Sequence, residues 1–152
     1  MANFSFNGID GIAASFEELA RLTDEEKKSI IMPAAKFLLE RQVNKIRSVF
    51  KQRTGDLANS LVLEDRSDSD GVKAFIYPSG KHRGSFTGKR RGKRNSNGKY
   101  SGTNAEVAYI LNFGSPRISA THWLDNANDE AEEEVLAMEE AAWDELLKKK
   151  GL

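Results

Sequence analysis

Cysteine is absent from this 152-residue chain. Disulfide bonds, thiolate metal sites and cysteine-based catalysis are therefore excluded. Long apolar runs are also missing, since no stretch approaches the roughly 20 apolar residues that a membrane-spanning helix needs. The first residues lack the basic segment, followed by an apolar one, that marks a secretory signal. We therefore expect a protein of a reducing compartment, with one modest core and no membrane partner.

The sequence motifs of common catalytic and cofactor sites are missing too. The only histidines, His82 and His122, have no second ligand at metal-binding spacing. The glycines in segment 88–94 lack the Gly-Lys-Ser/Thr of a phosphate-binding loop, and segment 8–11 lacks the dinucleotide fingerprint. A Gly-x-Ser-x-Gly nucleophile motif is absent. We expect no enzymatic activity, no metal and no cofactor.

Charge is abundant but segregated along the chain. The 23 basic and 23 acidic residues balance to zero, yet segment 81–99 carries only cations and segment 125–145 only anions. The acidic segment has helical spacing, so it predicts a solvated helix face or, alternatively, a surface that meets a basic loop of a neighbouring subunit. The basic segment predicts a subunit contact, contact with nucleic-acid backbones, or no specific role. Its cations are Lys81, Arg83, Lys89, Arg90, Arg91, Lys93, Arg94 and Lys99.

A long amphipathic helix from Thr23 to about Arg53 is the strongest secondary-structure signal. Thr23 and Glu26 have the spacing of a capping box, and Gly55 is expected to stop the helix. Pro33 interrupts the run, which predicts either a kink or a helix that ends near residue 32 and restarts at Pro33. One apolar stripe follows the helical period: Leu39, Val43, Ile46 and Phe50.

The remaining sequence indicates short elements joined by polar loops. Segment 13–22 predicts a short first helix, and segment 56–61 is either a helical turn or the approach to a strand. Strands are expected over 60–64 and 72–77, with a hairpin loop over 65–71. Segment 79–104 is rich in glycine and predicts a flexible basic loop. Segment 105–113 fits a strand or a short helix, and a last helix is expected over 121–149, capped by Gly151.

Together these elements predict a single α+β domain over residues 1–152. In this fold a long N-terminal helix and a C-terminal helix pack on a small antiparallel β-sheet, and a long basic flexible loop projects from it. Within this domain, residues 1–22 are expected to form an N-terminal segment with the short helix.

An ordered set of short motifs resembles a known family. A long helix leads to the turn at 53–61, and then follow the apolar stretch 108–114 and the segment 116–127 before an acidic helix. This set resembles the tail-component family of long-tailed bacteriophages and prophages, whose members act in tail completion or head–tail joining. Residues 24–150 carry the resemblance. The matching positions are Thr54, Gly55, Leu57, Ser60, Tyr109, Phe113, Gly114, Trp123, Leu124 and Ala127.

The resemblance implies a non-enzymatic subunit of a ring at the tail end or neck, expected to be hexameric. Its implied partners are copies of itself, other tail, neck or head-connector proteins, and phage DNA through non-specific contact. It implies a place in the virion, and in the host cytoplasm during assembly. Phe113 and Gly114 would close the sheet side, and Trp123 and Leu124 would pin the last helix to it. The chain departs from the family pattern at His122-Trp123, where proline and phenylalanine are usual, and in the length of its basic loop.

Overall fold

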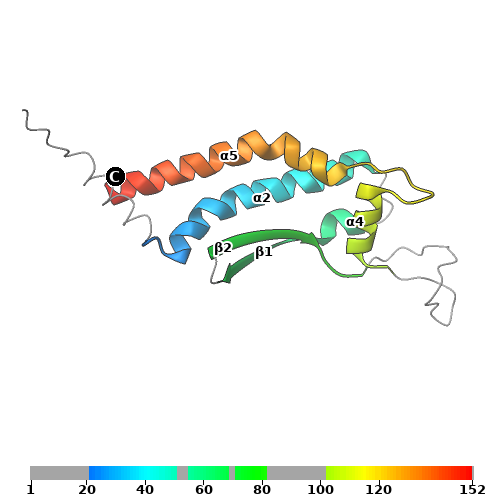
Figure 1. Cartoon of the computed structure of the whole chain (residues 1–152), viewed down its shortest axis with the longest axis horizontal. Helices are drawn as coiled ribbons and strands as arrows, with labels where there is room; N and C mark the ends of the chain where they lie inside the picture. Colours follow the sequence, from blue (N-terminus) through cyan, green and yellow to red (C-terminus); the bar gives the residue numbers. More distant parts are fainter. Residues whose placement is uncertain (1–20, 51–54, 69–70, 82–101, 152) are drawn as a thin grey trace, which may run out of the picture.

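The computed structural model describes residues 21–50, 55–68, 71–81 and 102–151 (Figure 1). Predictions that fall on residues 1–20, 51–54, 69–70, 82–101 and 152, including most of the short helix over 13–22, lie outside this part of the chain. The described elements, in chain order, are α2 (Asp24–Val49), α3 (Asp56–Ser60), β1 (Leu61–Asp68), β2 (Gly71–Pro78), α4 (Asn104–Phe113) and α5 (Trp123–Lys150).

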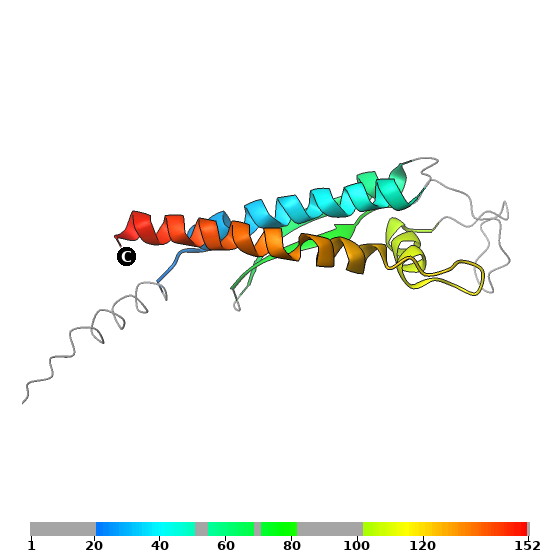
Figure 2. The same cartoon turned by 90° about the horizontal axis from the view of Figure 1, so that it is seen from above.

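The two long helices α2 and α5 run side by side along the longest axis of the molecule, and the β1–β2 hairpin lies against α2 (Figures 1 and 2). The two strands pair antiparallel from Leu61 opposite Pro78 to Asp68 opposite Gly71. Helices α3 and α4 gather at the end of the molecule away from the C-terminus (Figure 1). This arrangement confirms the predicted α+β fold with long helices packed on a small antiparallel sheet.

Helix α2 begins as the sequence predicts and ends earlier. Thr23 Oγ1 accepts from the Glu26 backbone N–H at 3.2 Å, and Glu26 Oε2 accepts from the Thr23 backbone N–H at 2.9 Å, which completes the capping box. The helix passes through Pro33 unbroken, so the predicted restart there is wrong. Pro33 is exposed, and water can hydrate the carbonyl that its missing N–H leaves free.

The end of α2 differs from the predicted stop at Arg53 and Gly55. Phe50 adopts an extended conformation (φ −112°) and its half-buried ring packs against the core, so the helix ends at Val49. Gly55 instead has a left-handed conformation (φ 69°) and directly precedes α3. Burial of Phe50 therefore ends the helix before the glycine is reached.

Helices α2 and α5 meet along small residues that permit close approach. Ala34, Ala127 and Ala131 are at most 2% exposed. Ion pairs flank this seam and fix its antiparallel register: Glu26 with Lys150 at 2.9 Å, Arg41 with Glu134 at 2.9 Å, and Lys45 with Glu130. The predicted last helix is confirmed, with Gly151 as its left-handed cap (φ 76°), although it starts at Trp123.

The hairpin is longer than the sequence predicts. Asp65 to Asp68 continue β1 and Gly71 begins β2, so the predicted loop over 65–71 is wrong. Charge pairing explains how such a polar segment forms a strand: Asp65 binds Lys28 of α2 at 2.9 Å, and Asp68 binds Lys73 of β2 at 2.9 Å.

Two segments that the sequence could not assign to helix or strand are helical. Segment 56–61 contains the short helix α3, and segment 105–113 lies in α4. Thr103 and Glu106 form a second capping box that starts α4. Phe113 and Gly114 therefore end a helix, and the prediction that they close the sheet is wrong.

Candidate functional site

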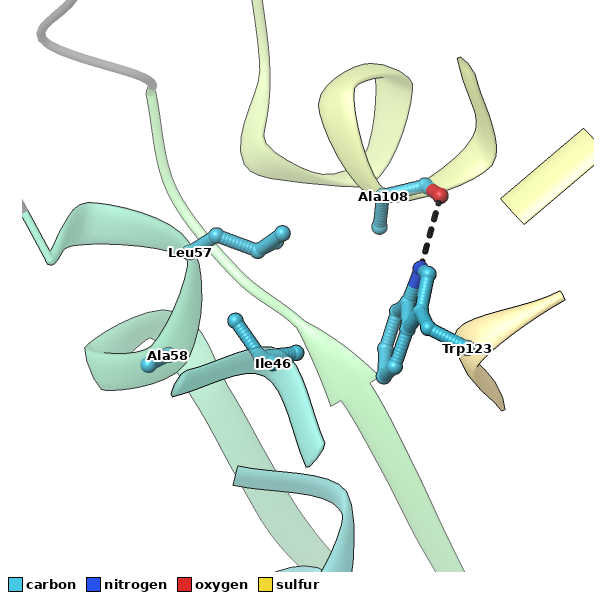
Figure 3. Packing of buried hydrophobic residues seen from close by; sticks show 5 residues of the cluster. All are labelled: Ile46, Leu57, Ala58, Ala108 and Trp123. Atoms are coloured by element: carbon cyan, nitrogen blue, oxygen red, sulfur yellow. Dashed lines mark hydrogen bonds between the residues drawn. The ribbon is translucent and has the colours of Figure 1, made fainter. Parts of the chain in front are cut away.

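Helices α2, α3, α4 and α5 meet at one end of the molecule, and Trp123 lies at the centre of this contact (Figure 3). Its side chain is 1% exposed, and its Nε1–H donates to the Ala108 carbonyl of α4 at 3.3 Å. Ile46 of α2 and Leu57 and Ala58 of α3 complete the cluster. Leu61, the first residue of β1, also packs against this cluster, so Trp123 lies where α5 meets both the other helices and the start of the sheet.

A buried asparagine joins α4 to the start of α5. Asn112 is 2% exposed, and its Oδ1 accepts from the Leu124 backbone N–H at 3.0 Å. Its Nδ2 donates to Asp125 at 3.3 Å, and its carbonyl accepts from the His122 backbone N–H at 3.1 Å. His122 has a positive φ of 48° and makes no side-chain cap. Asn112 thus performs the capping role from another helix, a function that no local motif in the sequence indicates.

Gly114 lets the chain turn sharply after α4. Its backbone (φ 82°, ψ 179°) lies in a region that only glycine occupies readily. A Cβ atom at this position would lie 2.8 Å from the Ala120 backbone N and 2.9 Å from the Ile118 carbonyl O. The return segment is held against α4 by Thr121, whose N–H and Oγ1 both donate to the Leu111 carbonyl. The family-motif glycine therefore has a structural explanation.

Replacing Gly114 by alanine is expected to lower the free energy of unfolding by about 3 kcal/mol, because backbone strain and a backbone clash both arise. Urea unfolding followed by circular dichroism measures the loss. Gly151→Ala is the matched control: its φ is also positive, but nothing lies within 4 Å of the added carbon. Equal losses in the two variants would contradict the role of the close contact at Gly114.

The opposite side of α4 exposes two aromatic rings. Tyr109 is 64% exposed and Phe113 is 56% exposed, and their ring centroids lie 4.8 Å apart. Ile118, in the segment that follows, is 41% exposed. We call Tyr109, Phe113 and Ile118 the aromatic patch. Since α4 is fixed from behind by Trp123 and Asn112, the patch presents large apolar groups at little cost in conformational entropy, as protein interfaces require.

The remaining family-motif residues are structural. Leu57 is buried, and the buried Ser60 Oγ donates to the Leu57 carbonyl at 2.8 Å. Ala127 lies in the α2–α5 seam, and Leu124 packs against the Trp123 cluster. Thr54 lies outside the described residues. The structure thus brings the motif positions within the described ranges to one end of the molecule.

The basic segment leaves and rejoins the described fold at one place beside α4. Lys81 is exposed and forms an isolated β-bridge with Thr103. Asn104 Nδ2 donates to the Ser79 carbonyl at 2.7 Å, and its backbone N–H donates to the Gly80 carbonyl at 3.1 Å. The other predicted contact residues lie outside the described residues: Arg83, Lys89, Arg90, Arg91, Lys93, Arg94 and Lys99. The predicted contact between this segment and a partner stays a prediction.

The acidic segment divides into two groups on α5. Glu130 and Glu134 pair with cations of α2 within the same chain. Further acids of this segment are exposed: Asp125, Asp129, Glu132, Glu133, Glu140, Asp144 and Glu145. Within residues 21–50, 55–68, 71–81 and 102–151, no group of three or more His, Asp or Glu could hold a metal ion. In the same ranges no helix is long and apolar enough to cross a membrane.

The outer face of the hairpin also combines apolar and charged groups. Glu64 accepts from Arg66 Nη2 at 2.8 Å and from the Tyr77 hydroxyl at 2.8 Å. The Arg66 guanidinium lies 5.3 Å from the centre of the Phe75 ring. Val62, Phe75 and Tyr77 are each about 40% exposed. This face is therefore a second surface with exposed aromatic groups.

Two carboxyl groups, those of Glu26 and Glu64, make the stability of the fold depend on pH. The Thr23 backbone N–H, with Lys150, holds the pKa of Glu26 below its usual 4.5, and Arg66, with the Tyr77 hydroxyl, does the same for the pKa of Glu64. Because both pKa values are lower in the folded state, this stabilisation is present above the unfolded-state pKa and is lost as pH falls through the folded-state pKa.

We therefore expect the melting temperature to fall between about pH 6 and about pH 3. The fall should be smaller in the double variant Glu26→Gln, Glu64→Gln, which has lost both titrating groups. Differential scanning calorimetry over this range measures the effect. An equal fall in both proteins would contradict the assignment to these two carboxylates.

A scan against protein-family models found no match for the chain, and searches of curated proteins and of solved structures found no significant match either.

Proposed function

We propose that the chain is a structural protein of a tailed bacteriophage or prophage, acting in tail completion or head–tail joining as a subunit of a ring at the tail end or neck. The aromatic patch on α4 is the observation that carries this proposal. A rigid helix that exposes Tyr109 and Phe113 in contact with each other suits burial against a protein partner far better than exposure to water.

The class of assembly comes from the ordered motif set. The buried members of that set, such as Leu57 and Trp123, hold α3, α4 and α5 together, while Tyr109 and Phe113 remain on the surface. The motif therefore supplies both a rigid support and an exposed contact, which is what a ring subunit requires. The basic segment rejoins the fold at the start of α4, so a neighbouring subunit that covers the patch would also lie close to the base of that segment.

Electron microscopy of a lysate from a phage that lacks this gene tests the proposal. We expect full heads beside separate tails, or tails of uncontrolled length. Supplying the intact gene on a plasmid should restore joined particles, which is the control for effects on neighbouring genes. Normal joined virions without the gene would overturn the proposal.

A second candidate function is non-specific nucleic-acid binding by the basic segment. The observation in its favour is the base of the segment, where exposed Lys81 is held next to Thr103, so that the cations that follow start from a fixed point. Affinity for duplex DNA should then fall steeply with salt concentration. It should disappear when five cations become glutamine: Lys89, Arg90, Arg91, Lys93 and Arg94. Unchanged DNA binding in that variant would exclude this function.

A further inference from the structure

The far edge of β2 presents unused backbone hydrogen-bonding groups. The Ser79 N–H donates to the Ser60 carbonyl at 2.8 Å. This bond fixes which residues along each strand form backbone hydrogen bonds within the hairpin and which direct their backbone groups outward. In this register Lys73, Phe75 and Tyr77 bond to β1 through their backbones, while Val72, Ala74 and Ile76 direct N–H and C=O groups away from it. No strand within the described ranges pairs with that edge. An open edge of this kind is a template for another strand.

The two edges of the hairpin are not equivalent. On β1, the residues whose backbones point outward include Asp65, whose carboxylate lies on the α2 side of the sheet and binds Lys28 at 2.9 Å. A charge on the packed face of an edge strand is a common protection against unwanted pairing. The corresponding β2 positions carry only the apolar side chains of Val72, Ala74 and Ile76, all half-buried. The β2 edge is therefore the one suited to pairing.

We propose that β2 pairs antiparallel with β2 of a second copy of this chain, about a two-fold axis at Ala74, and so forms a four-stranded sheet. In this register Ala74 lies opposite Ala74 of the second copy, and Val72 lies opposite its Ile76. All three residues with outward-pointing backbone groups then find partners. A shift of two residues toward the strand end sets Val72 against Pro78, which has no N–H, and a shift the other way sets Ile76 against a position before Gly71, the first residue of β2.

The outer face supports the same register. Lys73 comes to lie opposite Phe75 of the second copy, in the closer type of antiparallel pair. Phe75 is 43% exposed and already has the Arg66 guanidinium at 5.3 Å, so the second copy adds another cation beside an exposed ring. Lys73 also remains next to Asp68 of its own chain. The pairing thus gains apolar and cation–π contacts and brings no like charges opposite each other.

The packed face leaves room for both copies of α2. Two strands span about 10 Å, which matches the diameter of about 10 Å of a helix with its side chains. Each hairpin can therefore keep its own α2. Helix α4 lies beyond the Pro78 end of β2 (Figure 1), so antiparallel pairing places the two aromatic patches at opposite ends of the dimer. The dimer does not depend on the proposed function, and it leaves both patches free for other contacts.

Cross-linking tests the register directly, because the chain has no cysteine of its own. In the proposed dimer the two Ala74 Cα atoms are about 5.5 Å apart, within the range of a disulfide. Full-length Ala74→Cys should form a disulfide-linked dimer under mild oxidation, whereas Val62→Cys, on the outer face of β1, should not. Equal cross-linking of the two variants, or none at Ala74, would overturn the proposed register.

Sedimentation of the cysteine-free protein gives the second measurement. The intact chain should sediment at twice its monomer mass of 16.9 kDa. Ala74→Pro removes one outward N–H without touching the β1–β2 ladder, and should halve the mass while circular dichroism stays unchanged. Ser67→Pro removes an outward N–H from the β1 edge and should leave the dimer intact. A monomeric intact chain, or a dimer that survives Ala74→Pro, would overturn the proposal.

Discussion

Trp123→Ala is expected to lower the free energy of unfolding by about 3–5 kcal/mol, the largest loss for any single replacement proposed for this chain. The side chain is 1% exposed and contacts Ile46 and Leu57, and its Nε1–H bonds to the Ala108 carbonyl. Removing it empties the place at which four helices meet. Since domains of this size are stable by about 5–15 kcal/mol, the variant should be close to unfolding at physiological temperature.

Two control variants separate the contributions of this residue. Trp123→Phe keeps an aromatic ring and loses the hydrogen bond to Ala108, so it should cost about 1–2 kcal/mol. Trp143→Ala removes the same side chain from a half-buried position of α5 and should cost less than Trp123→Ala. Urea unfolding followed by circular dichroism ranks the three. Equal losses at Trp123 and Trp143 would contradict the central place of Trp123.

The double variant Tyr109→Gln, Phe113→Gln is expected to abolish complementation of a phage that lacks the gene. Each ring is a candidate hot spot worth about 2 kcal/mol of binding energy, or about 30-fold in affinity, so the loss of both rings weakens association about 1,000-fold. Both rings are exposed and glutamine is a good helix former, so the free energy of unfolding should change by less than about 1 kcal/mol. The number of joined particles per cell, counted by electron microscopy, measures the effect.

Leu136→Gln is the matched control for this variant, because Leu136 is 51% exposed on α5 and lies away from the aromatic patch. It should complement normally. Normal complementation by the double variant would show that the patch is not the assembly contact, even if the chain itself proves necessary for joined particles. The gene deletion therefore tests the proposed function, and the double variant tests the aromatic patch separately.

Local signals in the sequence predicted the elements whose causes are themselves local. The capping box at Thr23 and the C-terminal Gly151 mark helix ends by contacts within a few residues, and both predictions are confirmed. The same capping pattern at Thr103 and Glu106 is a local signal for the start of α4. The apolar run over 72–77 similarly predicted β2.

Features that depend on distant contacts were not predictable in this way. The sequence of Asp65 to Asp68 is typical of a loop, and the segment is a strand because Lys28 and Lys73 form ion pairs with its aspartates. Asn112 caps a helix that begins eleven positions later, which no spacing rule describes. The sequence placed Trp123 beside the sheet but did not reveal that α3 and α4 are helices that also enclose it. For the candidate site, the motif predicted which residues matter but not which are buried and which are exposed.

The antiparallel seam between α2 and α5 has a consequence for how the chain emerges from the ribosome. Its contacts join residues far apart in sequence, such as Glu26 with Lys150 and Arg41 with Glu134. Trp123, which completes the core, also belongs to the last helix. Until α5 has been synthesised, the side of α2 that packs on it therefore lacks its partner. We expect the fold to form only once α5 has left the ribosome, and the nascent chain to be a client of chaperones that shield unpaired amphipathic helices until then.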